Sequence, residues 1–406
     1  PQESQAEEQP VFDYLVANVG KKPGVPADNT VKGSQFNQPL LEFSGACAGC
    51  GETPYAKLIT QLYGDKMIIA NATGCTSIWA SSTPSTPYNT DANGRGPAWA
   101  NSLFEDNAEF GYGMKLAQDA IKSGIARKLE EINDTTSDEA LKKAITEYLG
   151  TLNDTNLSAK ATDELIPLLE KCDDPLAKEV LKDKNFMSKK SHWIFGGDGW
   201  AYDIGFGGLD HVLASGENVN VMVFDTEMYS NTGGQASKAS NIGEVCQFAA
   251  SGKEVGKKSL AEIAMSYGYV YVAQIALGAN MAQAVKVIAE AEAYNGPSLI
   301  IGYAPCELHG VKGGMNHCQD EMKKAVAAGY WNLFSFNPQL KAEGKNPFTL
   351  TSKPGDGSYQ DFLNNETRYS RLTRAFPERA ERLFKASEEA AKARYEHLQR
   401  LVELYK

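Results

Sequence analysis

The chain has 406 residues, 42% hydrophobic and 22% charged, which is typical of a water-soluble globular protein with about two or three structural units. The net charge of −11 argues against nucleic acid as the main partner, because phosphate binding requires a basic surface. No apolar run approaches the roughly 18 residues that span a bilayer, and no secretory signal opens the chain. We therefore expect a cytoplasmic protein without membrane contact. Because residue 1 is Pro, we also expect a piece of a longer or processed protein.

The odd number of cysteines does not indicate a disulfide framework but a reducing compartment and thiolate chemistry. They are Cys47, Cys50, Cys75, Cys172, Cys246, Cys306 and Cys318. The first pair forms a CxxC motif between glycines and precedes a predicted helix over 55–63, whereas residues 1–40 are expected to form a linker or arm.

A short apolar strand over 66–70 leads to Gly74-Cys75, and a long loop follows over 80–103. A loop of this length inside a compact domain is usually functional or interfacial. From residue 108 to about 184, apolar residues recur at helical spacing. This pattern predicts three or four amphipathic helices, the first packed on the sheet and the others in a helical insertion over about 125–188.

Strand patterns resume over 191–196, 219–225, 269–275 and 298–303, and helical patterns over 204–215, 260–267 and 279–293 lie between them. This alternation predicts an α/β fold with a doubly wound, mostly parallel sheet, which binds ligands at the carboxyl ends of its strands. The residues expected at those ends are Gly74-Cys75, Gly197-Asp198-Gly199, Asp225-Thr226 and Pro305-Cys306. The chemistry-bearing residues of the chain are therefore expected along one edge of the sheet.

After a helix over 321–330, an irregular arm over 337–359 leads to a charged helical tail over 366–405. The arm contains a second Gly-Asp-Gly at 355–357, which follows Lys353-Pro354 rather than a strand and is predicted to be a simple turn. We expect a main domain over 41–335. Residues 336–406 are expected to pack on a partner domain or subunit.

The strand end at Asp198 and the loop over 225–235 have the composition of a site for a metal ion and a polyanion. Mg²⁺ takes carboxylate, hydroxyl and carbonyl oxygens and completes its shell with phosphate. Asp198, the Thr226 hydroxyl and the Met228 carbonyl could supply these ligands. Nearby glycines would let backbone N–H groups approach a diphosphate, and the helix that Gly205–Gly208 opens would favour an anion. A lone Gly-Asp-Gly could equally be a tight strand-to-helix turn.

The spacing from Gly197-Asp198-Gly199 to Thr226–Asn231 resembles the thiamine-diphosphate-binding motif. Thr226 stands where that motif usually has a metal-binding Asn. This departure, with Thr232-Gly233-Gly234-Gln235 after it, resembles the 2-oxoacid:ferredoxin oxidoreductases, and among them the pyruvate:ferredoxin (flavodoxin) oxidoreductases. The resemblance covers most of residues 40–330 and implies the thiamine-diphosphate-binding fold with a bound Mg²⁺.

By spacing alone, Cys47, Cys50, Cys75 and Cys306 fit zinc as well as iron. The resemblance implies that these four hold a [4Fe–4S] cluster, with Cys318 as the alternative fourth ligand. Cys172 and Cys246 are expected to be structural.

The same resemblance implies a role for Asn231 at the reacting centre, where it would hydrogen-bond the substrate-derived group. His309 and His317 are predicted to be surface or structural residues rather than acid–base groups. The residues implied to contact the cofactor are Glu52, Cys75, Gly197, Asp198, Gly199, Trp200, Thr226, Glu227, Met228, Tyr229, Ser230 and Asn231.

The activity implied is oxidative decarboxylation of pyruvate to acetyl-CoA and CO₂, with electrons passed through the cluster towards ferredoxin or flavodoxin. No Glu of this chain has the context of the residue that activates thiamine. The resemblance therefore implies that this Glu and the sites for substrate carboxylate and coenzyme A lie on other domains of the same enzyme, together with further clusters. We expect a homodimer. The alternatives are the same chemistry on another 2-oxoacid, or a zinc-stabilised α/β module without catalysis.

Overall fold

The computed structural model describes residues 2–22, 24–81 and 86–406. These residues form two compact units. One consists of residues 1–109 and 193–406, and the other of residues 110–192. No helix among the described residues is long and apolar enough to cross a membrane.

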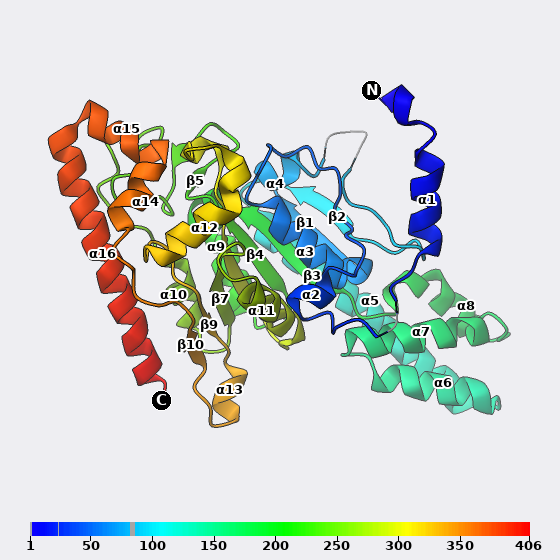
Figure 1. The fold of residues 1–406 in the computed structure, drawn as a ribbon. Coiled ribbons are helices and arrows are strands. Elements are labelled where there is room, and N and C mark those ends of the chain that lie inside the picture. Colours follow the sequence, from blue (N-terminus) through cyan, green and yellow to red (C-terminus); the bar gives the residue numbers. More distant parts are fainter. Residues whose placement is uncertain (1, 23, 82–85) are drawn as a thin grey trace. The chain divides into compact units, whose positions relative to one another are not determined.

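The first unit is built on an eight-stranded sheet with the order β10-β9-β7-β8-β4-β3-β1-β2 (Figure 1). The pairs of β1 with β2, β3 with β4, β4 with β8 and β7 with β8 are parallel, whereas β9 and β10 run antiparallel at one edge. A separate two-stranded hairpin joins β5 to β6. The strands are β1 Met67–Ala72, β2 Ala98–Ser102, β3 Ser191–Gly197, β4 Asn220–Asp225, β5 Met228–Tyr229, β6 Gln235–Ala236, β7 Tyr271–Ile275, β8 Ser298–Tyr303, β9 Phe334–Phe336 and β10 Phe348–Leu350.

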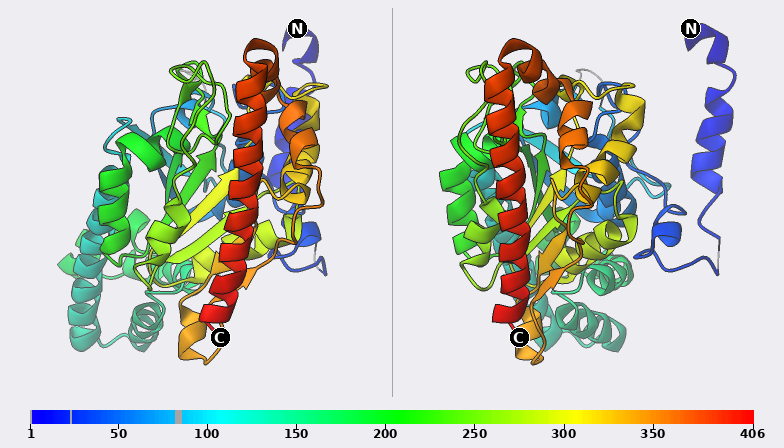
Figure 2. Two further views of the ribbon diagram at one scale, coloured as in Figure 1. Left: turned by 90° about the vertical axis from the view of Figure 1, so that its left-hand side faces the viewer. Right: turned by 60° about the vertical axis from the view of Figure 1, so that its left-hand side comes forward.

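Every residue of β4 and β8 is buried, which explains their unbroken apolar sequences. Helices flank the sheet on both faces (Figure 2), so the predicted doubly wound, mostly parallel α/β fold is confirmed. The helices of this unit are α1 Gln9–Asn18, α2 Val31–Ser34, α3 Thr53–Tyr63, α4 Cys75–Ile78, α9 Phe206–Ala214, α10 Leu260–Met265, α11 Met281–Ala293, α12 Cys318–Ala327, α13 Gln339–Ala342, α14 Tyr359–Asn365, α15 Thr367–Ala375 and α16 Pro377–Leu404.

Two of the strands, β2 and β10, lie in segments that the sequence predicted to be irregular, and β9 lies just before the predicted arm. β2, Ala98–Ser102, occupies the end of the expected loop and forms the half-exposed edge beside β1. β9 and β10 have only three residues each, too few to show an alternating pattern. The expected arm at the amino end contains α1, which has no buried residue, and its large apolar side chains Val11, Phe12 and Leu15 are exposed.

The second unit has a helical core of its own. α5 runs from Asn107 to Thr135, and α6 Glu139–Gly150, α7 Thr155–Leu169 and α8 Pro175–Lys182 follow. Asp138, Asp154 and Asp174 cap these last three helices, each accepting hydrogen bonds from backbone N–H groups of the first turn. The predicted amphipathic helices are confirmed, and the fully buried side chains of the core include Leu129, Ile132, Ile145, Tyr148, Leu165 and Val180.

The helical tail packs on its own chain. The backbone N–H of Val245 donates to the carbonyl of Arg368 at 2.9 Å, and Arg394 of α16, the long red helix of Figure 2, pairs with Glu262 of α10 at 3.0 Å. Tyr369 and Leu372 are fully buried. The tail therefore finds a folding surface inside this chain, where the sequence had suggested only a partner. The predicted division at residues 40 and 335, and a contact of the tail with another domain, stay predictions.

Candidate cofactor site

Four strand ends meet because β8, β4, β3 and β1 are neighbours in that order. The residues beyond them come from distant parts of the sequence: Cys306 after β8, Thr226 after β4, Asp198 after β3 and Cys75 after β1. The parallel sheet thus brings the predicted metal-binding and thiol groups to one edge.

Three oxygens stand in the arrangement that a small divalent ion requires. The Thr226 hydroxyl lies 2.9 Å from Oδ1 of Asp198 and 3.1 Å from the carbonyl oxygen of Met228. Adjacent ligands of an octahedral Mg²⁺, each about 2.1 Å from the ion, are about 3 Å apart. Oδ2 of Asp198 is held by the Ser237 hydroxyl at 2.6 Å, so the carboxylate is fixed. The three oxygens therefore fit one face of a magnesium shell.

Asp198 is fully buried, and its hydrogen-bond donors, the Thr226 N–H and the two hydroxyls, are all neutral. Burial, followed by the charge of Asp225, raises the pKa of Asp198 well above its usual range. A bound cation would favour the charged carboxylate, so the donor set matches a metal chemically as well as by distance.

A cavity of about 120 Å³ opens beside these oxygens. Eleven of the twelve residues predicted to contact the cofactor line it, and Glu227 is the exception. Thr73, Gly74, Phe104 and Thr232 also line it, and of these Thr73 and Phe104 carried no motif. The predicted members are Glu52, Cys75, Gly197, Asp198, Gly199, Trp200, Thr226, Met228, Tyr229, Ser230 and Asn231.

Glu52 reaches the cavity from the start of α3. It is 3% exposed, and its Oε2 accepts a hydrogen bond from the Trp79 indole N–H at 2.8 Å. Burial raises the pKa of Glu52 to about 7, against the opposing effect of the Trp79 bond. Asn231 differs, because its side chain is exposed at the mouth.

The chain turns sharply after Asp198 through a short π-helical segment, Gly199–Ile204. A Cβ on Gly199 would lie 2.7 Å from the Tyr229 ring, so this position requires glycine. Gly233 and Gly234 have positive φ and form the turn between β5 and β6.

The glycine-rich start of α9 was expected to favour an anion at the cofactor site, but it does not line the cavity. None of Gly205, Gly207 and Gly208 is among the described lining residues. A Cβ on Gly208 would meet the Glu109 carboxylate at 2.2 Å, so an acid already occupies this helix start. The expectation of an anion site there was wrong. The glycines that line the cavity are Gly74, Gly197 and Gly199.

Four thiols lie at the same edge, near enough for their charges to influence one another. Burial, followed by the charges of Glu52, Cys306, Cys50 and Cys47, raises the pKa of Cys75. The backbone N–H of Gly51 donates to the Pro305 carbonyl at 3.1 Å, which joins the CxxC loop to the turn before Cys306. A Cβ on Gly51 would lie 2.6 Å from that carbonyl oxygen, so the approach requires glycine.

Within the described part of the chain, no three His, Cys, Asp or Glu side chains lie close enough to hold a single metal ion. A [4Fe–4S] cluster takes one thiolate per iron, so its ligands stand further apart than those of zinc. The choice between zinc and a cluster therefore stays a prediction. Cys318 is buried at the start of α12, whereas Cys306 is half-buried beside Ser230.

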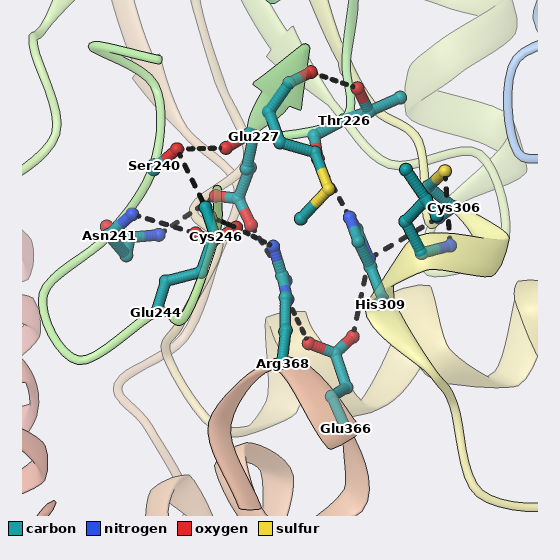
Figure 3. A network of polar contacts seen from close by, with 12 residues as sticks. Thr226, Glu227, Ser240, Asn241, Glu244, Cys246, Cys306, His309, Glu366 and Arg368 are labelled. Atoms are coloured by element: carbon teal, nitrogen blue, oxygen red, sulfur yellow. Dashed lines mark hydrogen bonds and ion pairs between the residues drawn. The ribbon is translucent and has the colours of Figure 1, made fainter. Parts of the chain in front are cut away.

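Glu227 points away from the cavity into a buried network of charges (Figure 3). Arg368 of α15 contacts it at 2.9 Å and Lys257 at 3.0 Å, and the Tyr330 hydroxyl donates to it at 2.6 Å. Burial alone would raise the pKa of Glu227, but the two cations outweigh it and lower the pKa to about 2. Glu227 has φ +63°, a strained conformation for a residue other than glycine. Its pinned side chain holds the turn that directs Thr226 and Met228 towards Asp198.

The rest of this network was not foreseen. Arg368 also contacts Glu366 at 2.6 Å and Glu244 at 3.3 Å, and Lys257 contacts Asp225 at 2.8 Å. Apart from Asp225, which the sequence placed at a strand end, no motif marks these residues. A single Arg in a charged tail is typically a surface residue. Cys246, predicted to be structural, is buried with its sulfur 3.2 Å from Glu244. His309 is fully buried rather than on the surface, and His317 is exposed.

The comparisons with known proteins agree with this geometry. Residues 182–301 match the family model described as the thiamine pyrophosphate enzyme, C-terminal TPP binding domain. Over 401 residues the chain is 53% identical to a pyruvate-flavodoxin oxidoreductase of Klebsiella pneumoniae, covering 98% of this chain and 34% of the relative. It is 56% identical over 385 residues to a pyruvate:ferredoxin oxidoreductase of Moorella thermoacetica, covering 92% and 32%.

A third relative, a mitochondrial pyruvate dehydrogenase [NADP(+)] of Euglena gracilis, is 51% identical over 377 residues, covering 92% of this chain and 21% of the relative. The chain thus spans between a fifth and about a third of the length of these relatives. A solved 2-oxoglutarate:ferredoxin oxidoreductase chain of Magnetococcus marinus aligns with 14% identity and a TM-score of 0.41, covering 79% of this chain and 86% of that one. That likeness is too weak to bear on the activity.

Proposed function

Because this chain is a relative of the pyruvate:ferredoxin (flavodoxin) oxidoreductases that matches about a third of their length, we propose that it is the cofactor-binding portion of such an enzyme. The whole enzyme would convert pyruvate and coenzyme A to acetyl-CoA and CO₂ and pass the electrons to ferredoxin or flavodoxin. In this proposal the chain binds thiamine diphosphate, Mg²⁺ and one [4Fe–4S] cluster.

One observation carries the proposal. A single cavity is lined both by the three oxygens that fit Mg²⁺ and by Cys75, whose thiol lies near those of Cys47, Cys50 and Cys306. When bound, thiamine diphosphate supplies the electron sink for loss of CO₂ from a 2-oxoacid, and the cluster supplies a one-electron acceptor. An acceptor beside the cavity is what separates an oxidoreductase from a simple decarboxylase.

The residues of this chain have distinct tasks in the proposal. Asp198, the Thr226 hydroxyl and the Met228 carbonyl hold the magnesium ion that carries the diphosphate. Asn231, exposed at the mouth, donates a hydrogen bond to the substrate-derived group. Glu52, with a pKa of about 7, holds or releases a proton on its carboxylate near neutral pH.

The remaining wall of the site is assigned to other domains of the enzyme. Phe43 and Phe248 are 90% and 94% exposed, and both have positive φ, which is costly for a bulky side chain. Gln247, next to Phe248, donates to the carbonyl of Gly234 in the cofactor loop. Exposed rings held in strained conformations near the loop support a covering partner. The homodimer and the cytoplasmic location are kept as proposals.

The proposal is tested on the assembled enzyme by comparing coenzyme A-dependent oxidation of pyruvate and 2-oxoglutarate. We expect pyruvate to be preferred. A preference for 2-oxoglutarate would mean that the substrate of the enzyme is a 2-oxoacid other than pyruvate. The isolated chain should bind thiamine diphosphate and iron without turnover. Coenzyme A-dependent pyruvate oxidation by the isolated chain would refute the proposal that this chain is only the cofactor-binding portion of the enzyme.

The ligand set is tested by two matched cysteine variants of the assembled enzyme. Cys306→Ser should lose one cluster's worth of iron, and Cys318→Ser should retain it. The reverse result would show that Cys318, not Cys306, is the fourth ligand of the cluster. Bound zinc in place of iron would favour the non-catalytic module.

A further inference from the structure

His309 lies between the cofactor loop and the turn that carries Cys306. It is fully buried at the end of a short helical turn, Glu307–His309, and its ring stacks on Tyr303 with centroids 6.5 Å apart. It does not line the described cavity and touches no group proposed to react. A buried histidine with both ring nitrogens engaged, outside the cavity, calls for a role other than acid–base catalysis.

The two ring nitrogens contact different loops (Figure 3). Nε2 lies 2.8 Å from the carbonyl oxygen of Thr226, and because a carbonyl only accepts, Nε2 carries the proton. Nδ1 then accepts the backbone N–H of Cys306 at 3.4 Å. The residues at the two ends of this link are those whose hydroxyl and sulfur are proposed to bind magnesium and iron.

Glu366 of the tail lies beside the ring without a hydrogen bond to it. Its Oε1 is 3.7 Å from Nδ1, and its other carboxylate oxygen accepts from Nε of Arg368 at 2.6 Å. Arg368 in turn contacts Glu227, the neighbour of Thr226, at 2.9 Å. The tail thus packs against the imidazole, and the link between the two loops consists of the two hydrogen bonds of the ring. A rigid ring held by both bonds transmits a displacement from one loop to the other.

We propose that His309 is a positioning residue that couples the thiamine diphosphate–magnesium site to the iron–sulfur site by hydrogen bonds to Thr226 and Cys306. This inference rests on the proposed function. Filling the magnesium site draws on Thr226, and the link carries that change to the backbone beside a cluster ligand. Hydrogen bonds around a cluster ligand tune the electronic properties of the cluster, so the change is visible in its spectrum.

Two substitutions separate the halves of the link. His309→Gln keeps an N–H donor at the place of Nε2 for the Thr226 carbonyl but has no acceptor at the place of Nδ1 for Cys306. His309→Phe keeps the flat ring on Tyr303 and loses both bonds. His317→Gln, on an exposed histidine eight residues away, is the matched control.

The experiment uses the assembled enzyme without substrate. The spectrum of the reduced cluster is recorded by electron paramagnetic resonance with and without Mg²⁺ and thiamine diphosphate, after subtraction of the spectrum of the Cys306→Ser variant. The affinity for thiamine diphosphate is measured by calorimetry. In the unaltered enzyme and in His317→Gln, we expect the cofactor to change the cluster spectrum.

His309→Gln should lose that spectral response with an affinity within about threefold of the unaltered enzyme, and His309→Phe should lose the response and bind about tenfold more weakly. An unchanged spectral response in His309→Gln, or no response in the unaltered enzyme, would overturn the coupling. Failure of the proposed function is a different result: the unaltered enzyme would bind no thiamine diphosphate, or Cys306→Ser would lose no iron.

Discussion

Asp198 and Glu227 are both fully buried carboxylates at neighbouring strand ends, yet their surroundings are opposite. Glu227 is paired with Arg368 and Lys257, and its pKa falls to about 2. Asp198 has only neutral hydrogen-bond donors, and its pKa rises. One charge is neutralised within the chain, and the other is left for a ligand. A buried charge therefore indicates a binding site when its own chain does not neutralise it.

Removing the cation that neutralises Glu227 should have the largest effect on stability. Arg368→Met leaves Glu227, Glu244 and Glu366 without their shared cation. Removing one partner of a buried ion pair costs about 3–5 kcal/mol, so we expect a loss of that order in the free energy of unfolding. Urea unfolding of the full enzyme, followed by tryptophan fluorescence, measures it. Arg382→Met, at an exposed pair with Glu254, should leave the midpoint unchanged.

His192, in β3, is another buried ionisable group, and the opposite charge of Asp119 does not offset its burial. Burial, followed by the Lys115 charge, lowers its pKa from 6.5 to about 4. The unfolded chain then binds the proton more tightly, so the stability present above pH 6.5 is lost as the pH falls towards 4. The loss should reach about 3 kcal/mol.

Unfolding midpoints measured between pH 7 and pH 4 test this expectation, and the His192→Phe variant should lack that part of the pH dependence. His211→Gln, on an exposed residue, is the control. If His192→Phe follows the same pH curve as the unaltered protein, another group titrates.

The assignment of Asp198 as a metal ligand is tested by comparing two aspartates, each the centre of a Gly-Asp-Gly tripeptide. Asp198→Asn should lower the affinity for Mg²⁺ and thiamine diphosphate by at least about 100-fold, since the hard cation loses its only carboxylate in the oxygen triad. Asp356→Asn alters the second Gly-Asp-Gly, where the side chain is exposed and only bonds to Ser358. Calorimetry on both variants should separate them, and equal loss in both would contradict the assignment of Asp198.

The smallest change in stability is expected for two glycine substitutions. Gly199→Ala forces a Cβ to within 2.7 Å of the Tyr229 ring and should weaken cofactor binding and destabilise the unit by about 1 kcal/mol or more. Gly207→Ala, in α9, has no atom within 4 Å of its new Cβ. It should stabilise the helix by about 0.5–1 kcal/mol, because alanine loses less backbone entropy. Thermal unfolding midpoints test the opposite stability changes expected for the two variants, and calorimetry tests the cofactor affinity of Gly199→Ala.

The sequence was most informative where a buried strand ends in a polar group. The strands that end near Cys75, Asp198, Thr226 and Cys306 were predicted within about two residues, because apolar runs and strand-end chemistry are local signals. Neither Arg368 nor Lys257 could be found this way, since what makes each important is a set of carboxylates brought close only by folding. The helix start at Gly205–Gly208 misled for the same reason: Glu109, which occupies it, is distant in sequence.

The strand order has a consequence for how the chain folds during synthesis. β8 lies between β4 and β7, and β3 follows β1 in the sequence only after the helical second unit, so the four strands of the cofactor edge cannot be assembled before residue 303 has left the ribosome. β9 and β10 complete the sheet only at residue 350. The second unit needs only residues 110–192 and is held together by short-range helical contacts, which form quickly. The helical unit can therefore be native while the edge that will carry the cofactor is still unpaired strand. Loading of the complete site must then follow the synthesis of β8 and of Cys306 beyond it.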